Sequence, residues 1–249
     1  MVVDTLKQGQ GNRTAILCSG GLDSAVLMAN ELHSALSSSQ KDPFLQPVYV
    51  NSGFSWESTE QECIGQLLTI APFSGRIRPI VNLSCPVADT YPESHWALSG
   101  IPPSYNTEDE EVYLVGRNVI LLAKVSAYCA VNNIGRILIG PLAGNPFPDA
   151  SPEFLTAMES TLSMGLAHRI QISAPFGERT KVEVIELGHS LGVPFEFTLS
   201  CMNPVRSAAP AEHCGKCSKC RERLQAFDAA HLTDPARYTF RPNDVWVGT

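Results

Sequence analysis

The sequence predicts an α/β fold, in which a doubly wound, parallel five-stranded sheet carries a small appendage at the C-terminus. Short apolar runs alternate with helical patterns, a glycine-rich turn joins the first run to the first helix, and cysteines replace this alternation after residue 199. Alternation of strands and helices is typical of a parallel sheet that is covered on both faces. We therefore expect an α/β domain over residues 1–199 and a distinct C-terminal region over residues 200–249.

The expected strands are five short apolar runs, at residues 14–18, 47–51, 77–83, 136–140 and 169–174. The helical patterns that separate or follow them cover residues 24–32, 58–69, 118–132, 152–163 and 181–191. Pro152 supports the start of one helix, because the first helical turn has no use for the N–H group that proline lacks.

A long segment, residues 84–116, interrupts this alternation and is rich in proline and acidic residues. Connections of this length are unusual in a compact domain. The segment is therefore either a loop that covers a substrate or a solvated excursion of the surface.

The composition favours a small-molecule substrate. The chain has 249 residues, 44% of them hydrophobic, and a formal net charge of −7, so it offers no general basic field and nucleic acid is not an expected partner. No apolar run is long enough to span a membrane, and the N-terminal residues lack a signal-peptide pattern. We expect a cytoplasmic protein, in which the eight cysteines are thiols or metal ligands rather than disulfides.

The turn after the first strand has the composition of a phosphate-binding loop, Ser19, Gly20, Gly21, Leu22, Asp23 and Ser24. Backbone N–H groups at the start of a helix attract anions, and glycines allow close approach of the backbone. The serines add hydroxyl donors. The alternative is a glycine turn in which Ser24 only stabilises the helix.

Four cysteines near the C-terminus have the spacing of a metal site, namely Cys201, Cys214, Cys217 and Cys220. Four thiolates close a tetrahedral structural zinc site, so the appendage is expected to bind one Zn²⁺ ion. A three-cysteine iron–sulfur cluster and unrelated reduced thiols are the alternatives. The basic residues around this motif, among them Lys219 and Arg223, either form a solvated face or border a nucleotide.

The loop from Ser19 to Ser24 resembles that of the PP-loop ATP pyrophosphatases, which cleave ATP between its α and β phosphates. Together with the motif from Leu199 to Leu224, it makes the chain resemble the 7-cyano-7-deazaguanine synthase family of queuosine biosynthesis. Further matches are the Gly-Arg-Asn triplet at residues 116–118, the Thr-Lys-x-Glu step at 180–183 and the run at 188–194.

This resemblance implies ATP with Mg²⁺, ammonia and a deazapurine carboxylic acid as ligands, an adenylated carboxylate and an adenylated amide as intermediates, and a homodimer. The implied ATP-binding residues are Ser19, Gly20, Gly21, Leu22, Asp23 and Ser24. The implied catalytic residues are Arg117, Lys181 and Asp23, where Asp23 helps to hold Mg²⁺. The implied substrate-binding residues are Asn118, Phe147 and Asp149. Asp149 is expected to accept hydrogen bonds from a guanine-like edge, or else to cap the helix that starts at Pro152.

Two departures from the family pattern leave the acceptor open. Residues 51–57 lack the Arg and His that the family usually has there, and Ala150 follows Asp149 where the family usually has Cys. The alternatives are therefore a paralogue that ligates a deazapurine acid to another amine, a sulfur-transfer enzyme acting on tRNA, and a non-catalytic nucleotide-binding regulator.

Overall fold

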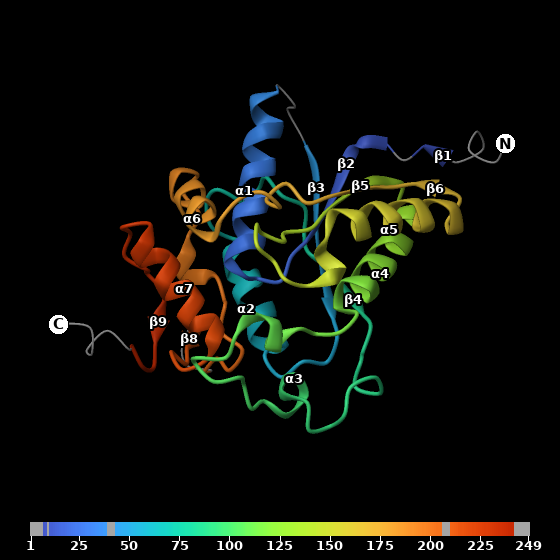
Figure 1. The fold of residues 1–249 in the computed structure, drawn as a ribbon. Coiled ribbons are helices and arrows are strands. Elements are labelled where there is room, and N and C mark those ends of the chain that lie inside the picture. Colours follow the sequence, from blue (N-terminus) through green and yellow to red (C-terminus); the bar gives the residue numbers. More distant parts are fainter. Residues whose placement is uncertain (1–6, 9, 39–42, 206–209, 242–249) are drawn as a thin grey trace.

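The computed structural model describes residues 7–8, 10–38, 43–205 and 210–241. Its centre is a five-stranded sheet with the strand order β4-β3-β2-β5-β7 (Figure 1). These strands are β2 Gln10–Leu17, β3 Phe44–Asn51, β4 Val81–Ser84, β5 Ile134–Leu138 and β7 Gln171–Ser173. Every neighbouring pair in this sheet is parallel, which confirms the predicted doubly wound architecture.

The strand order places a topological switch point at the centre of the sheet. The chain runs from β2 outward to β3 and β4, and then returns to add β5 and β7 on the other side of β2. Connections therefore leave the C-terminal ends of β2 and β5 in opposite directions. Ligands of such sheets bind in the crevice outside these strand ends.

Helices cover both faces of the sheet, with α1, α6 and α7 on one side and α4 and α5 on the other (Figure 1). The longer helices are α1 Leu22–Ser37, α2 Glu57–Leu67, α4 Arg117–Val131, α5 Pro152–Gly165, α6 Lys181–Ser190 and α7 Ser218–Ala229. The short elements are α3 Trp96–Ser99, η2 Asp109–Val112, η3 Pro148–Ala150, η4 Phe195–Phe197, β1 Lys7–Gln8, β6 His168–Arg169, β8 Glu212–His213 and β9 Arg237–Tyr238. Within the described ranges, no helix is long and apolar enough to cross a membrane.

The strands read as continuous apolar runs because both of their faces are buried. Ile16 of β2 belongs to the cluster beneath α1 and α6, whereas its neighbour Ala15 belongs to the cluster beneath α4 and α5. Leu138 and Ile137 of β5 divide between the two clusters in the same way. Successive side chains of a strand point to opposite faces, so one run of residues supplies two cores.

Two predicted strands were longer than the strands that form, and in both cases hydrogen bonding explains why. The run at 77–83 becomes a strand only at Val81, since Pro79 has no N–H to donate and its carbonyl accepts from Gln46 Nε2 at 2.6 Å. The run at 169–174 splits at Ile170, whose N–H and carbonyl both bind Ser163 Oγ, at 3.1 and 3.2 Å. As a result, β6 pairs with β1 in a separate small sheet.

The long segment from 84 to 116 packs onto the protein. Four of its apolar side chains, Val87, Ala97, Val112 and Leu114, are buried in one cluster with Trp56 and the four C-terminal cysteines. Its tip is held by Arg221, which donates to the carbonyls of Tyr105 at 2.8 Å and Thr107 at 3.1 Å. These parts of the segment are therefore not a solvated excursion.

We expect Gly188→Ala to destabilise the protein, because α6 packs closely at this residue. A Cβ at Gly188 would lie 2.5 Å from Val26 Cγ2 and 2.6 Å from Phe195 Cζ. Overpacking of this kind costs about 1–3 kcal/mol. Gly165→Ala in α5 is the matched control, because a Cβ there meets no heavy atom within 4 Å. Urea unfolding midpoints would measure both, and equal midpoints for the two variants would contradict the close packing.

Candidate active site and metal centre

The loop between β2 and α1 opens toward the C-terminal edge of the sheet. Gly20 has φ +72°, and a Cβ there would lie 3.0 Å from the Glu60 carbonyl oxygen, so glycine is required. The Gly21 N–H donates to Ser19 Oγ at 3.2 Å, and Ser24 Oγ donates to the Gly21 carbonyl at 3.0 Å. The loop thus has a defined shape at the N-terminal end of α1, where an anion is stabilised.

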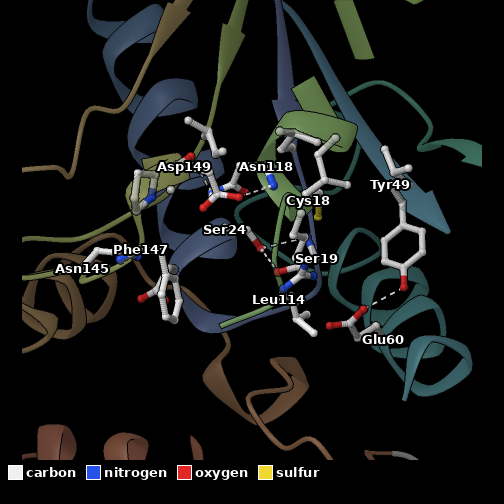
Figure 2. Close-up of a pocket in the computed structure, with 18 of the residues that line it drawn as sticks. Cys18, Ser19, Ser24, Tyr49, Glu60, Leu114, Asn118, Asn145, Phe147 and Asp149 are labelled. Carbon is white, nitrogen blue, oxygen red and sulfur yellow. Dashed lines mark hydrogen bonds between the residues drawn. The ribbon is translucent and has the colours of Figure 1, made fainter. Parts of the chain in front are cut away.

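Two adjoining cavities, of about 250 Å³ and about 240 Å³, lie around this loop. Figure 2 shows the first of them, with Ser19 and Ser24 between the Tyr49–Glu60 pair on one side and Asn118, Phe147 and Asp149 on the other. The residues that line both cavities are Ser19, Asp23, Glu60, Val112, Leu114, Arg117 and Phe147. A ligand that fills one cavity would therefore be within reach of a ligand in the other.

The structure brings most of the predicted site residues to these walls. The first cavity is lined by the predicted residues Ser19, Asp23, Ser24, Arg117, Asn118, Phe147 and Asp149. The second is lined by the predicted residues Ser19, Gly21, Leu22, Asp23, Arg117, Phe147 and Lys181. Gly20 lines neither cavity; its carbonyl accepts from the Leu199 N–H at 2.8 Å and so joins the loop to the chain before the first cysteine.

Asp149 lies at the wall of the first cavity and caps a helix other than the expected one. Its Oδ2 accepts from the backbone N–H of Asn118 at 2.9 Å, at the start of α4, and Asn118 Nδ2 donates to its Oδ1 at 3.4 Å. The helix at Pro152 is capped by Ser151, whose Oγ accepts from Phe154 N–H at 3.1 Å. Burial raises the pKa of Asp149, and the hydrogen bonds from Asn118 oppose this.

An aromatic wall stands beside Asp149. The ring of Phe147 stacks on that of Tyr113, with centroids 5.0 Å apart and planes inclined by 19°. Tyr113 belongs to the segment from 84 to 116, so this segment contributes to the cavity. A planar ligand would find both an aromatic wall and a carboxylate here.

A chain of alternating charges lines the second cavity. Lys181 Nζ lies 2.7 Å from Asp23 Oδ2 and 3.4 Å from Glu222 Oε1, and Lys219 Nζ lies 2.7 Å from Glu222 Oε2. Burial opposes the charge on Lys181, but Asp23 and Glu222 outweigh it and raise the pKa of the lysine. Burial likewise opposes the charge on Glu222, yet Lys181 and Lys219 lower its pKa to about 2. Lys181 and Glu222 are therefore both charged at neutral pH.

Two buried polar atoms at these walls have no hydrogen-bond partner among the described residues. One is Asp23 Oδ1 and the other is Arg117 Nε. Buried polar atoms are normally paired, so each of them suits a ligand. A carboxylate oxygen is a ligand for Mg²⁺, and a guanidinium N–H suits a phosphate or a carboxylate.

The sequence-based prediction missed a group of residues on β3 and α2. Tyr49 OH donates to Glu60 Oε2 at 2.7 Å, and the carboxylate of Glu57 accepts from the N–H groups of Ser52 at 2.7 Å and Gly53 at 2.8 Å. Burial raises the pKa of Glu60 to about 7. A signal was present in the sequence, because Glu57 and Glu60 both lie in the first turn of the helix that follows β3. This turn lies at the edge of the sheet where ligands bind.

The basic residues around the cysteine motif have different roles. Lys219 lines the second cavity, so it borders the predicted nucleotide site. Arg223 is completely buried, and its guanidinium binds the carboxylate of Asp234 through two hydrogen bonds of 2.9 Å. Of the two alternatives, Lys219 therefore fits a residue that borders the cavity, whereas the buried Arg223 fits neither.

The four predicted metal ligands meet in one buried cluster. The Sγ atoms of Cys201, Cys214, Cys217 and Cys220 all lie within 4.8 Å of one another. Backbone N–H groups donate to two of them: Asn203 and Cys214 to Cys201 Sγ at 3.3 and 3.2 Å, and Lys216 to Cys214 Sγ at 3.3 Å. These donors stabilise thiolates, so the cluster is suited to bind a metal ion.

A parallel sheet with a phosphate-binding loop at its switch point and a lysine–carboxylate array beside it defines an enzyme that uses a nucleotide. The family described as queuosine biosynthesis protein QueC matches residues 97–231. The 7-cyano-7-deazaguanine synthase of Halobacterium salinarum is 30% identical over 239 residues, which cover 93% of this chain and 97% of that protein. The same enzyme of Methanopyrus kandleri is 30% identical over 237 residues, covering 90% of this chain and 98% of that protein.

The chain therefore belongs to the QueC family, the 7-cyano-7-deazaguanine synthases. Among solved structures, the U34-tRNA thiolase NcsA from Methanococcus maripaludis with its 4Fe-4S cluster matches 91% of this chain and 67% of that chain. The sequence identity is 16% and the TM-score is 0.47.

We expect Cys217→Ser to lose the bound metal and to lower the thermal stability, because closing a metal site contributes free energy to folding. The measurements are elemental analysis and thermal unfolding. Cys85→Ser is the control, since Cys85 is a half-buried cysteine outside the cluster. About one zinc per chain in the unaltered protein would support the four-cysteine zinc site. Iron with a visible charge-transfer band would show an iron–sulfur cluster instead, and unchanged stability in Cys217→Ser would contradict a structural metal.

Proposed function

We propose that this protein converts 7-carboxy-7-deazaguanine and ammonia to 7-cyano-7-deazaguanine at the expense of ATP. Membership of the QueC family supports this reaction. The observation that carries the proposal is the pair of adjoining cavities around the loop from Ser19 to Ser24, which share Ser19, Asp23 and Arg117. A reaction that joins a nucleotide to an acid needs two sites whose ligands meet.

The proposed nucleotide site is the second cavity and the loop. Gly21, Lys181 and Lys219 line this cavity and supply backbone and ammonium groups for phosphate. Mg²⁺ would be held by Asp23, whose Oδ1 has no other partner among the described residues, and would offset negative charge on the phosphates. The α-phosphate belongs beside Arg117, because that residue reaches both cavities.

The proposed acid site is the first cavity, where Asp149 and Phe147 face the deazapurine. The acid's carboxylate oxygen attacks the α-phosphate and pyrophosphate leaves. Ammonia then displaces AMP to give the amide. A second adenylation, on the amide oxygen, turns that oxygen into a leaving group, and loss of AMP gives the nitrile. The protein's part is to align the reactants and to stabilise negative charge through Arg117 and Lys181.

The remaining parts of the proposal concern the metal and the assembly. Zn²⁺ on Cys201, Cys214, Cys217 and Cys220 is proposed as structural, because four thiolates leave no open coordination position. The proposed function further predicts a bound Zn²⁺ ion, a homodimeric assembly and a cytoplasmic location.

The test is product identification by mass spectrometry after incubation with ATP, Mg²⁺, ¹⁵N-ammonia and 7-carboxy-7-deazaguanine. We expect the ¹⁵N-labelled nitrile, with two AMP formed per nitrile. Asp23→Ala should abolish AMP formation while the protein stays folded, because Asp23 faces the ligand. An acid that is adenylated but yields no nitrile would point to a different amine acceptor. No AMP formation at all in the unaltered protein would contradict the proposal.

We expect Asp149→Asn to raise the KM for the deazapurine acid by about 10- to 100-fold, since a charged hydrogen bond is worth about 1.5–3 kcal/mol. The KM for ATP should change far less. An asparagine oxygen can still accept from the Asn118 N–H, so the start of α4 should keep its cap. Steady-state kinetics with each substrate varied would measure both constants. Equal changes in the two constants would show that Asp149 only caps α4.

A further inference from the structure

Glu60 is a buried acid on the wall that the two cavities share. It lies on α2, 8% exposed, and its Oε2 accepts from Tyr49 OH at 2.7 Å. Figure 2 shows this pair pointing toward one another beside Ser19. Glu60 lines both cavities, so it borders the place where the α-phosphate and the acid would meet.

The proposed reaction needs a proton acceptor at this place. Adenylation of a carboxylate releases no proton, but conversion of the amide to the nitrile removes both hydrogens of the amide nitrogen as protons. One leaves to water as the amide oxygen attacks phosphorus. The other must leave as the C–O bond to AMP breaks, so that the electron pair of the N–H bond becomes the third C–N bond.

Among the described carboxylates at these walls, Glu60 is best suited to take that proton. Asp23 and Glu222 pair with Lys181. Glu57 is held by two backbone N–H groups, and Asp149 by Asn118. Asp23 and Glu222 thus have an ammonium partner and Glu57 and Asp149 have backbone N–H partners, whereas the hydrogen bond to Glu60 comes from the phenol of Tyr49.

We propose that Glu60 accepts the last proton of the amide nitrogen during loss of AMP, and that Tyr49 positions its carboxylate. This inference rests on the proposed function. The proton moves to a carboxylate oxygen of Glu60, the C–O bond breaks with its electron pair on AMP, and the nitrile is released. Glu60 then returns the proton to water.

The charge environment of Glu60 agrees with this role. Burial raises its pKa to about 7, while Arg117 of α4 and the hydrogen bonds from Tyr49 and Trp56 lower it, and Glu57 of its own helix raises it. The other titratable neighbours are the thiol of Cys18, directly after β2, and the thiol of Cys63 on α2, both with a pKa that burial raises to about 11. These thiols stay neutral near pH 7. Glu60 can therefore exchange a proton in the physiological range.

The first experiment separates the two activation steps by the substrate that is supplied. With ATP, Mg²⁺ and the amide of the deazapurine acid, Glu60→Gln should form nitrile at least about 100-fold more slowly, the usual contribution of a general base. Exchange of pyrophosphate into ATP with the carboxylic acid should stay within a few-fold of the unaltered enzyme, because that step moves no proton. Glu62→Gln, an exposed acid on the same helix, is the matched control and should leave both rates unchanged.

The second experiment is the pH dependence of nitrile formation from the amide, in which no ammonia takes part. The rate should fall as the pH drops below about 7, because Glu60 must be ionised to accept a proton. Tyr49→Phe removes a hydrogen bond that favours the ionised form, so it raises the pKa of Glu60 and should move this decline to higher pH. Glu60→Asp should restore part of the rate that Glu60→Gln loses.

The outcomes distinguish this inference from the proposed function. If the unaltered enzyme forms nitrile and Glu60→Gln does so at the same rate, Glu60 is not the acceptor. If Glu60→Gln loses pyrophosphate exchange to the same degree as nitrile formation, Glu60 serves only the fold or the ATP site. An unshifted pH profile in Tyr49→Phe would also overturn the inference, and this variant gives an answer even if Glu60→Gln does not fold.

An unaltered enzyme that adenylates the acid and never forms nitrile contradicts both the proposed function and this step. If the unaltered enzyme forms nitrile and the Glu60 variants form it equally fast, only the step assigned to Glu60 is contradicted.

Discussion

The arrangement of the C-terminal region depends on the buried ion pair between Arg223 and Asp234. Besides Asp234, the guanidinium of Arg223 donates to the carbonyl of Phe195 at 2.9 Å and to Oγ1 of Thr198 at 2.7 Å. Thr198 directly precedes Leu199, whose N–H binds the Gly20 carbonyl. One arginine thus connects helix α7, the chain that leads into the first cysteine and the phosphate-binding loop. Removing one partner of a buried pair costs about 3–5 kcal/mol, because the other charge is left unpaired.

Neighbouring residues of helix α7 take part in three different groups of contacts. Cys220 belongs to the cysteine cluster, Glu222 to the charged array and Arg223 to the buried ion pair. At 3.6 residues per turn, such neighbours point in different directions, so a single turn of helix can face the metal centre, the cavity and the core at once. Loss of the proposed metal is expected to move Glu222 relative to Lys181, because Glu222 lies two positions after Cys220 in α7. The proposed structural metal is in this way coupled to the geometry of the charged array.

The sequence predicted the sheet and the meeting of the four cysteines because both leave a local signal. Strands buried on two faces form apolar runs, and the cysteine spacing is specific. Two strands were predicted too long because the deciding partners, Gln46 for Pro79 and Ser163 for Ile170, are distant or lie on another element. Glu60 was missed for the same reason. The role proposed for it depends on Tyr49, which lies eleven positions earlier in the chain, and on burial that the helical pattern alone does not reveal.

The attachment of the long segment to α7 and its N-terminal flank couples two parts of the chain that are distant in sequence. Besides the two hydrogen bonds from Arg221, Ser104 forms an antiparallel bridge with Cys217, one of the cluster cysteines. The tip around residues 104–107 therefore belongs to the same cooperative unfolding unit as the cysteine region, although it lies more than ninety positions away in the chain. Fluctuations that expose the tip must break these contacts, so the exposure of the tip is tied to the local stability of the region that holds the four cysteines.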